Sequence, residues 1–244
     1  MRDRTPLTRL LGIECPIIQG PFCGQGACVE LAAAISSAGG LGSFGVQTLD
    51  GEQILRTIRA IRSRTSRAFA ANLWMPKDDD APAPALALPA ARGAPDLVEQ
   101  LQAVLEARPP VLSFTFGIPS PPLLRLCRQR GIITTGAAAS PQEAMALERA
   151  GVDCVVACGH AAGVRSDYVM RPPQVQATEI FSLLPSLVAS VRLPVIAAGG
   201  IGDAGGIAAA LALGAQGVQI GPAFLACWPP MRETVRRCAR PGCR

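Results

Sequence analysis

The chain has no long apolar run. No stretch of about eighteen consecutive apolar residues, the length needed to cross a membrane, occurs in its 244 residues. The N-terminal segment MRDRTPLTRLLGIECP is charged and has no apolar centre of signal-peptide length. Both absences argue against a membrane partner and against secretion, so we expect a cytoplasmic protein.

Metal-binding patterns are also missing. The nine cysteines include Cys23/Cys28, Cys154/Cys158 and Cys238/Cys243, but none forms a CxxC pair or a Cys/His set with zinc spacing. We therefore expect no metal site, and reduced thiols in a cytoplasmic setting.

Lysine and aromatic residues are scarce. The net charge of +5 comes almost entirely from arginine, since Lys77 is the only lysine, and aromatic residues make up 4% of the chain. The arginines between Arg56 and Arg67 have no aromatic residues among them, and a solvated helix face explains that pattern. A nucleic-acid partner is not expected.

Small and aliphatic residues are abundant instead. Hydrophobic residues account for 49% of the chain, mostly Ala, Val, Ile and Leu. This balance suits a parallel sheet buried on both faces, whose strands are continuous aliphatic runs. A length of 244 residues fits one α/β barrel domain.

Short β-branched runs alternate with helical segments along the whole chain, and several of the helical segments end in glycine, as at Gly151 and Gly214. This alternation predicts right-handed βαβ units and a parallel sheet. The expected strands are Pro16–Gln19, Leu41–Phe44, Ala68–Leu73, Val111–Phe116, Ile132–Gly136, Cys154–Ala157, Pro194–Ala198 and Gly217–Ile220. The expected helices are Val29–Ala38, Gly51–Arg62, Leu97–Ala107, Pro122–Gln129, Pro141–Ala150, Ile180–Val191 and Ala204–Leu213.

Eight such strands can close as a (β/α)8 TIM barrel, with an open doubly wound sheet as the competing architecture. We expect one barrel domain over residues 1–228, with the Pro-rich segment 76–95 as a surface excursion near the barrel mouth. Residues 229–244 are expected to form an irregular basic tail. The helix after the eighth strand has poor apolar content, so a barrel incomplete at this C-terminal helix remains an alternative.

Glycine-rich turns follow the seventh and eighth expected strands. PVIAAGG (Pro194–Gly200) runs into such a turn and then a helix, and GVQIG (Gly217–Gly221) repeats the arrangement. In (β/α)8 enzymes these two loops form the common phosphate site, because glycine lets backbone amides approach the phosphate closely. The alternative is that Gly200 and Gly221 only make tight turns.

Several segments resemble the nitronate monooxygenase family, once called 2-nitropropane dioxygenase. They are PIIQGPF (Pro16–Phe22), AAAISSAGGLG (Ala32–Gly42), Ala71–Trp74, SFTFGIP (Ser113–Pro119) and PVIAAGGI…AAALALGAQGVQIG, and the similarity covers nearly residues 5–227. The resemblance implies FMN bound across the C-terminal mouth of the barrel. It implies FMN contacts from Gln19, Gly20, Pro21, Asn72, Gly163, Gly200, Gln219, Ile220, Gly221 and Pro222.

Two positions depart from the family pattern. Where the family has Gly-Thr after the eighth strand, this chain has Gly221-Pro222, and proline provides neither an N–H nor a hydroxyl. After the sixth strand, the family pattern ends in a histidine that takes the α-proton of the substrate. That position falls on Val164 or Arg165, depending on a one-residue gap.

His160 is the only histidine in the chain, and it follows the sixth expected strand. Catalytic groups of this fold gather at such strand ends, and a histidine can act as a general base near neutral pH. However, His160 precedes the family position by four or five residues. We therefore consider both a relocated catalytic base and a loop histidine without a role. Without a base, nitronates that are already anionic still react.

Three functions remain open from the sequence. The first is an FMN-dependent oxidoreductase that oxidises alkyl nitronates or nitroalkanes, its small-molecule substrates, with dioxygen. The second is a related flavin-dependent reductase of the enoyl-acyl-carrier-protein type, which needs NAD(P)H. The third is a catalytically impaired, non-enzymatic family member. The oligomeric state is not indicated by the sequence.

Overall fold

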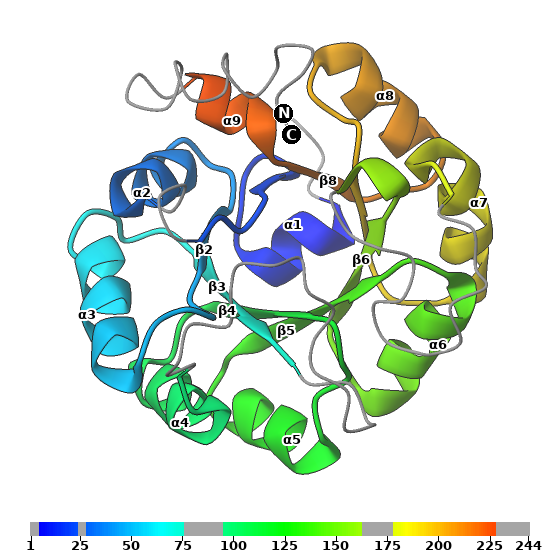
Figure 1. Cartoon of the computed structure of the whole chain (residues 1–244). Coiled ribbons are helices and arrows are strands. Elements are labelled where there is room, and N and C mark those ends of the chain that lie inside the picture. Colours follow the sequence, from blue (N-terminus) through cyan, green and yellow to red (C-terminus); the bar gives the residue numbers. More distant parts are fainter. Residues whose placement is uncertain (1–4, 24–27, 76–94, 163–177, 228–244) are drawn as a thin grey trace, which may run out of the picture.

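Eight parallel strands form one sheet around a closed barrel in the computed structural model, which describes residues 5–23, 28–75, 95–162 and 178–227 (Figure 1). Hydrogen-bonded neighbours follow the order β1-β8-β7-β6-β5-β4-β3-β2. Parallel bridges from Ile18 to Leu41 and from Phe22 to Phe44 join β1 to β2 and close the ring. The strands are β1 (Ile17–Gln19), β2 (Gly42–Gly45), β3 (Phe69–Trp74), β4 (Val111–Thr115), β5 (Ile133–Ala138), β6 (Cys154–Cys158), β7 (Val195–Ala198) and β8 (Gly217–Ile220).

Helices alternate with these strands and surround the barrel, which confirms the predicted (β/α)8 fold over an open sheet. Every predicted strand and helix is present, with ends that differ by no more than two residues. The outer helices are α2 (Val29–Ser37), α3 (Gly51–Arg62), α4 (Leu97–Ala107), α5 (Pro121–Gln129), α6 (Pro141–Ala150), α7 (Ile180–Ser190) and α8 (Ala204–Ala212).

Local sequence fixes where these helices begin and end. Asp50 caps α3 by accepting a hydrogen bond from the Gln53 amide, and the Gln53 side chain accepts one from the Asp50 amide. Ser140 caps α6, whose first residue is Pro141, and α6 ends at Gly151 with a φ of 97°. A left-handed residue after a helix favours glycine because glycine has no Cβ.

Two further α-helices in the described residues were not predicted. Helix α1 (Pro6–Leu11) precedes β1 and lies in the centre of the ring of strands in Figure 1, and α9 (Pro222–Cys227) follows β8. Helix α9 provides at least six residues of helix at the position where the sequence left an incomplete barrel open. Proline is well tolerated at the first helical position, because its missing N–H would have no partner there.

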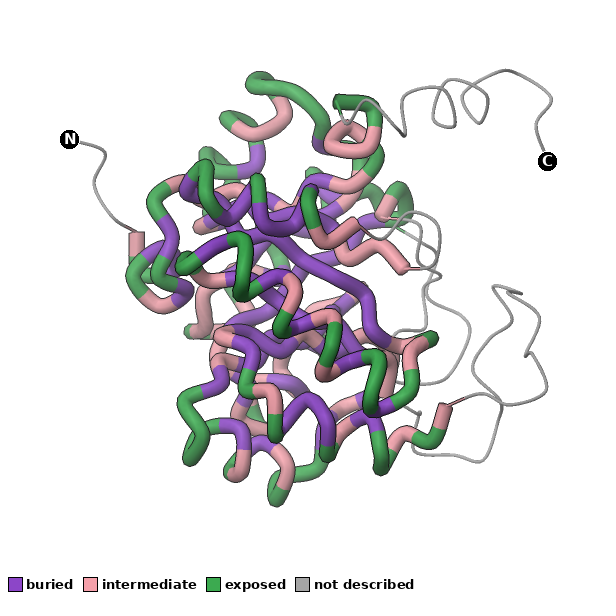
Figure 2. The backbone as a smooth tube through the Cα atoms, turned by 90° about the vertical axis from the view of Figure 1, so that its left-hand side faces the viewer, coloured by how far each residue is buried: buried purple, intermediate pink, exposed green. Residues whose placement is uncertain are grey.

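The core has two parts, separated by the wall of the barrel. Side chains that point outward from the strands pack against the surrounding helices, as Leu73, Leu112 and Val218 do. Inward-pointing side chains such as Ile18 and Ile196 pack with Leu7 and Leu11 of α1. Figure 2 shows the buried strands enclosed by helices whose outer faces are exposed. The inner cluster thus fills much of the barrel interior with apolar side chains.

Residues 76–94 of the predicted surface excursion and the predicted basic tail lie outside the described residues. Within the described ranges, the structure has no helix long and apolar enough to cross a membrane. The same ranges hold no group of three His, Cys, Asp or Glu side chains able to bind a metal ion.

Candidate functional site

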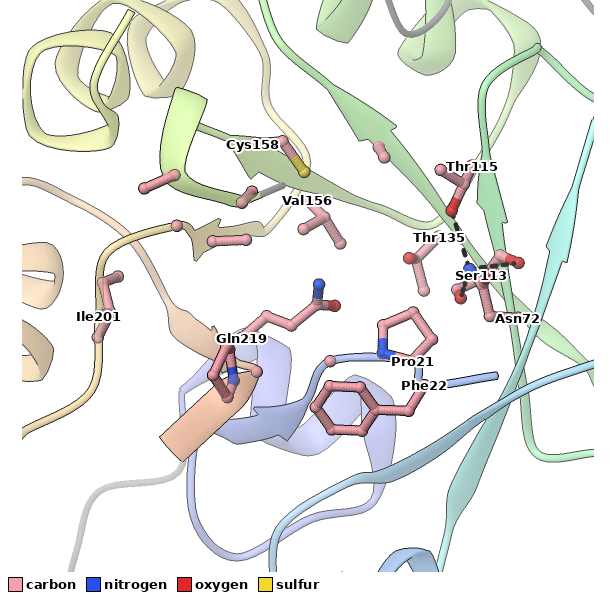
Figure 3. Close-up of a pocket in the computed structure, with 18 of the residues that line it drawn as sticks. Pro21, Phe22, Asn72, Ser113, Thr115, Thr135, Val156, Cys158, Ile201 and Gln219 are labelled. Carbon is pink, nitrogen blue, oxygen red and sulfur yellow. Dashed lines mark hydrogen bonds between the residues drawn. The ribbon is translucent and has the colours of Figure 1, made fainter. Parts of the chain in front are cut away.

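A cavity of about 600 Å³ lies at the carboxyl ends of the barrel strands (Figure 3). Its volume is within the range of small-molecule sites, about 300–1,000 Å³. The carboxyl end of the strands is also where (β/α)8 enzymes bind their substrates. Loops or strand ends from every part of the barrel contribute to its wall, so the cavity is the central feature of this face.

The turn after β7 forms one end of the cavity. Gly199 and Gly200 have φ values of 112° and 67°, and both line the cavity. Glycine adopts this left-handed conformation at little cost. Because it has no side chain, it also lets the backbone approach a ligand closely. Within the described residues, the backbone N–H groups of Gly200, Ile201 and Gly202 have no hydrogen-bond partner. These amides are therefore available to a ligand.

The turn after β8 lies beside the turn after β7. Gly221, Pro222 and Ala223 line the same cavity. The N–H groups of Gly221 and Ala223 bond to no described residue, whereas Pro222 has no N–H to donate. A Cβ added at Gly20 would lie 3.3 Å from the Cα of Gly221, so the β1 and β8 backbones are in close contact here. The two predicted glycine turns thus share one rim of the barrel.

Side chains from β3 and β4 form the opposite end. The Asn72 side-chain nitrogen donates to the hydroxyl oxygens of Ser113, at 2.6 Å, and Thr115, at 3.0 Å (Figure 3). No described residue donates to the side-chain carbonyl oxygen of Asn72, Oδ1. Because both hydroxyls orient the amide, this oxygen is presented to the cavity as an acceptor. The Trp74 and Phe116 rings pack edge to face, with centroids 5.2 Å apart.

The loop after β2 adds Gln47 to the wall of the cavity. Its backbone is held by Gln100 of α4, whose buried side-chain nitrogen donates to the carbonyl oxygens of Gln47, at 3.1 Å, and Leu49, at 2.7 Å. Nearby, burial raises the pKa of the Cys23 thiol, so Cys23 is a neutral thiol at pH 7. This part of the wall is polar but uncharged.

The described lining of the cavity contains no Asp, Glu, Lys, Arg or His side chain. Polar groups come from the amides and hydroxyls of Gln47, Asn72, Ser113, Thr115, Thr135 and Gln219, and apolar surface comes from Phe22, Trp74, Phe116, Val156 and Ile201. An anionic ligand would therefore be held in this part of the site by backbone and side-chain dipoles rather than by a countercharge.

Seven of the residues predicted to contact the cofactor line the cavity: Gly20, Pro21, Asn72, Gly200, Gln219, Gly221 and Pro222. Gln19 and Ile220 are not among the lining residues, and both are buried in the barrel wall. Successive residues of a strand point to opposite faces. Because Gly20 and Gln219 face the barrel interior, their neighbours Gln19 and Ile220 face the surrounding helices.

His160 lies at the end of β6, as predicted, but it does not line the cavity. Its side chain is exposed, and its backbone N–H donates to the carbonyl oxygen of Thr178 at 3.0 Å. The next two residues, Ala161 and Ala162, reach the cavity instead. Gly163, Val164 and Arg165 lie outside the described residues.

Sequence reasoning missed much of the wall. Phe22, Gln47, Thr115, Phe116, Thr135 and Cys158 line the cavity without having been predicted to do so. Five of the six lie at the carboxyl end of a strand or within three residues after it, and Thr135 lies inside β5. These residues could have been predicted from their position, because inward-facing residues near the carboxyl ends of the strands surround the same site in a barrel.

A family model described as nitronate monooxygenase matches residues 4–234. A probable nitronate monooxygenase of Staphylococcus aureus strain MSSA476 is 34% identical, over 92% of this chain and 68% of the relative. The structure of a nitroalkane oxidase from Streptomyces ansochromogenes matches with a TM-score of 0.78 and 34% identity, over 91% of this chain and 68% of that one.

A FabK structure from Thermotoga maritima matches almost as well. Its TM-score is 0.74 and its identity 33%, over 91% of this chain and 63% of that chain. The chain therefore spans about two thirds of the length of these similar proteins, and its described part contains the barrel and the cavity.

Proposed function

The chain belongs to the nitronate monooxygenase family, and on that premise we propose that it is an FMN-dependent oxidoreductase that oxidises alkyl nitronates or nitroalkanes with dioxygen. One observation carries the proposal. Gly200 and Gly221 lie in the turns after the neighbouring strands β7 and β8. Their backbone amides donate to no described acceptor and line one end of a cavity large enough for a cofactor and a small substrate.

The residues present fit FMN. Five unpartnered amides, at Gly200, Ile201, Gly202, Gly221 and Ala223, surround the end of the cavity where the phosphate would bind. Backbone N–H groups bind phosphate in this way at many glycine-rich turns. The loss of a donor at Pro222 weakens this site, since a hydrogen bond to a charged group contributes about 1.5–3 kcal/mol, but it does not remove it.

The opposite end of the cavity fits the flavin ring. The Asn72 carbonyl oxygen would accept from a ring N–H, and Gln219 lies between the two ends with its amide pointing into the cavity (Figure 3). Pro21 and Phe22 supply an apolar surface on which a planar ring packs. We propose these four residues, with Gly20, as the protein's contacts to the ring.

When bound, FMN supplies the redox centre that exchanges electrons with substrate and dioxygen. The protein's own part is to bind, orient and exclude water. Phe22, Trp74 and Phe116 give the ring end a largely apolar wall, and a less polar surrounding strengthens the hydrogen bonds made by Asn72.

Proton transfer separates the two substrate forms. A neutral nitroalkane needs a base, and the described lining offers only uncharged amides, hydroxyls and the thiols of Cys23 and Cys158. Since burial raises the pKa of the Cys23 thiol, that group is mostly protonated at neutral pH. A nitronate has already lost its proton. We therefore propose the anionic nitronate as the better substrate.

The first test is a visible absorption spectrum of the purified protein before and after FMN is added, followed by dialysis. We expect a bound flavin spectrum and oxygen consumption when ethane nitronate is supplied. A protein that stays colourless after FMN addition and dialysis would contradict the proposal and favour the non-enzymatic alternative.

A second candidate is the flavin-dependent, NAD(P)H-using reductase considered from the sequence. The observation that favours this second candidate is the nearly equal similarity of the chain to the FabK and nitroalkane oxidase structures, at 33% and 34% identity. Anaerobic addition of NADH or NADPH to the FMN-loaded protein distinguishes the two. Rapid bleaching of the flavin would favour the reductase, whereas an unchanged spectrum with nitronate-dependent oxygen consumption would favour the oxidase.

A further inference from the structure

We propose that the Trp74–Phe116 ring pair is a specificity-determining wall that limits the alkyl chain of the substrate to a short length. The inference rests on the proposed function and extends it from a reaction to a class of substrates, the short unbranched nitronates. It is carried by three features of the pair: its position in the barrel, the packing of its rings and the backbone conformation of Phe116.

The pair lies across the cavity from the glycine turns. Trp74 ends β3 and Phe116 directly follows β4, whereas Gly200 and Gly221 follow β7 and β8. In the ring of eight strands, β3 and β4 stand opposite β7 and β8 (Figure 1). A cofactor anchored by its phosphate at the glycine turns therefore extends toward β3 and β4. The reacting end of the cavity and the substrate then lie beside Trp74 and Phe116.

The two rings support each other. Their centroids are 5.2 Å apart and their planes are inclined at 81°, which is the favourable edge-to-face arrangement of aromatic rings. Both residues line the cavity and are partly buried. Phe116 also packs against the inner core cluster. Because the rings pack against each other and Phe116 also packs against the core, we expect the pair to resist displacement by a longer chain.

The backbone of Phe116 is in an uncommon conformation. Its φ is 68°, in the left-handed region that favours glycine and that a bulky residue rarely adopts. Only one other non-glycine residue in the described part of the chain, Arg108, has a positive φ. Left-handed residues that persist despite their cost are concentrated at ligand sites. The turn after β4 thus directs the Phe116 ring to Trp74, where a glycine would fit the backbone but leave the wall open.

The pair is the bulky part of this region, because the neighbouring side chains are small. Ala137, Ala161, Ala162 and Thr135 line the cavity around β5 and β6 and leave space there. With both rings in place, we expect a two- or three-carbon nitronate to be accepted. A six-carbon chain would have to displace Phe116, against its core contacts and its fixed backbone.

The test compares Phe116→Ala and Phe116→Gly with the wild-type protein, each supplied with FMN. Phe116→Ala removes the ring. Phe116→Gly also removes it, and glycine adopts the left-handed backbone conformation without strain. If Phe116→Ala fails to fold, Phe116→Gly still tests the proposal. The control is Phe181→Ala on α7, which removes an exposed phenylalanine outside the cavity. Two readouts are used: kcat/KM for hexane against ethane nitronate, and calorimetric binding of hexanoate against acetate.

Carboxylates serve as unreactive probes, because a carboxylate matches the planar, singly charged, two-oxygen head of a nitronate. In both Phe116 variants we expect the preference for the long over the short compound, in kcat/KM and in binding, to rise by about tenfold or more. Each methylene that gains or loses a matching pocket changes such a preference by roughly 10–200-fold. Phe181→Ala should keep the wild-type ratio. An unchanged ratio in both Phe116 variants would overturn the proposal.

The two readouts separate the two proposals. A shifted carboxylate ratio without nitronate turnover in any protein would support the aromatic wall and contradict the proposed reaction. Turnover of both nitronates with an unshifted ratio would support the reaction and overturn the wall. If no protein binds a carboxylate or turns over a nitronate, both are overturned.

Discussion

The two ends of the cavity are built from different parts of the polypeptide. At the ends of β7 and β8 the surface consists of backbone, with glycine turns whose amides have no described partner. At the ends of β3 and β4 it consists of side chains, with the Asn72 amide held by two hydroxyls and the Trp74 and Phe116 rings packed together.

The two ends therefore respond differently to amino-acid substitutions. A backbone end recognises charge without a titratable group, and a substitution alters it only by straining the turn or by removing an N–H. A side-chain end can be reshaped by exchanging single residues while the barrel stays intact. We expect the backbone end to determine whether a phosphorylated cofactor binds, and the side-chain end to determine which substrate reacts.

The largest effect is expected for Gly200→Ala, compared with Gly131→Ala. Both glycines have similar left-handed φ values, 67° and 71°, and neither has an atom closer than 3.7 Å to an added Cβ. Each variant should lose about 1–2 kcal/mol of stability, but only Gly200→Ala disturbs the cavity. We expect FMN to bind at least about tenfold more weakly to Gly200→Ala, which corresponds to about 1.4 kcal/mol. Equal FMN dissociation constants for the two variants, from fluorescence titration, would break the comparison.

A smaller effect of opposite sign is expected for Pro222→Ala. This change adds an N–H at the first residue of α9, between the unpartnered amides of Gly221 and Ala223. One more bond to phosphate should tighten FMN binding by up to about tenfold, given about 1.5–3 kcal/mol for a bond to a charged group less the cost of aligning it. Pro141→Ala, at the first residue of α6 and away from the cavity, is the matched control. If both variants bind FMN like the wild type, the turn after β8 does not contact the phosphate.

The smallest effect is expected outside both ends, for His160→Ala. His160 is exposed and does not line the cavity, so FMN affinity and nitronate turnover should stay within about twofold of the wild type, as for most surface changes. The pH profile of nitronate turnover should also match that of the wild type. If neutral nitroalkane turnover is lost while nitronate turnover remains, His160 is the base after all.

The fold could be predicted because each strand of a parallel barrel is a short aliphatic run followed by a capped helix. The two helices that were missed are short, but both carry local signals. Thr5 caps α1, Pro6 is its first residue and Gly12 ends it in a left-handed conformation. Pro222 similarly begins α9. Periodicity fails for such helices because six residues complete fewer than two turns.

The candidate site could be predicted where backbone chemistry dominates, as at Gly200 and Gly221, because glycine spacing is visible in the sequence. The predicted contacts Gln19 and Ile220 do not line the cavity, since a motif names neighbouring residues while a strand turns only alternate side chains to the same face. The Trp74–Phe116 contact joins residues 42 positions apart in the sequence. The left-handed φ of Phe116 could not be predicted, because the residue is not a glycine. Such features depend on tertiary packing.

Helix α1 has a consequence for how the chain reaches its native state. Leu7 and Leu11 fill the lower interior, the Leu7 amide donates to the Gln216 side chain, and Gly217 leaves the space that Leu7 occupies. The first segment is therefore anchored by the last strand, which leaves a ribosome some two hundred residues later. Contacts this distant in sequence form slowly. Until β8 emerges, Leu7 lacks the hydrogen bond to Gln216 and the space beside Gly217, and we expect sealing of the barrel seam to be a late event of folding.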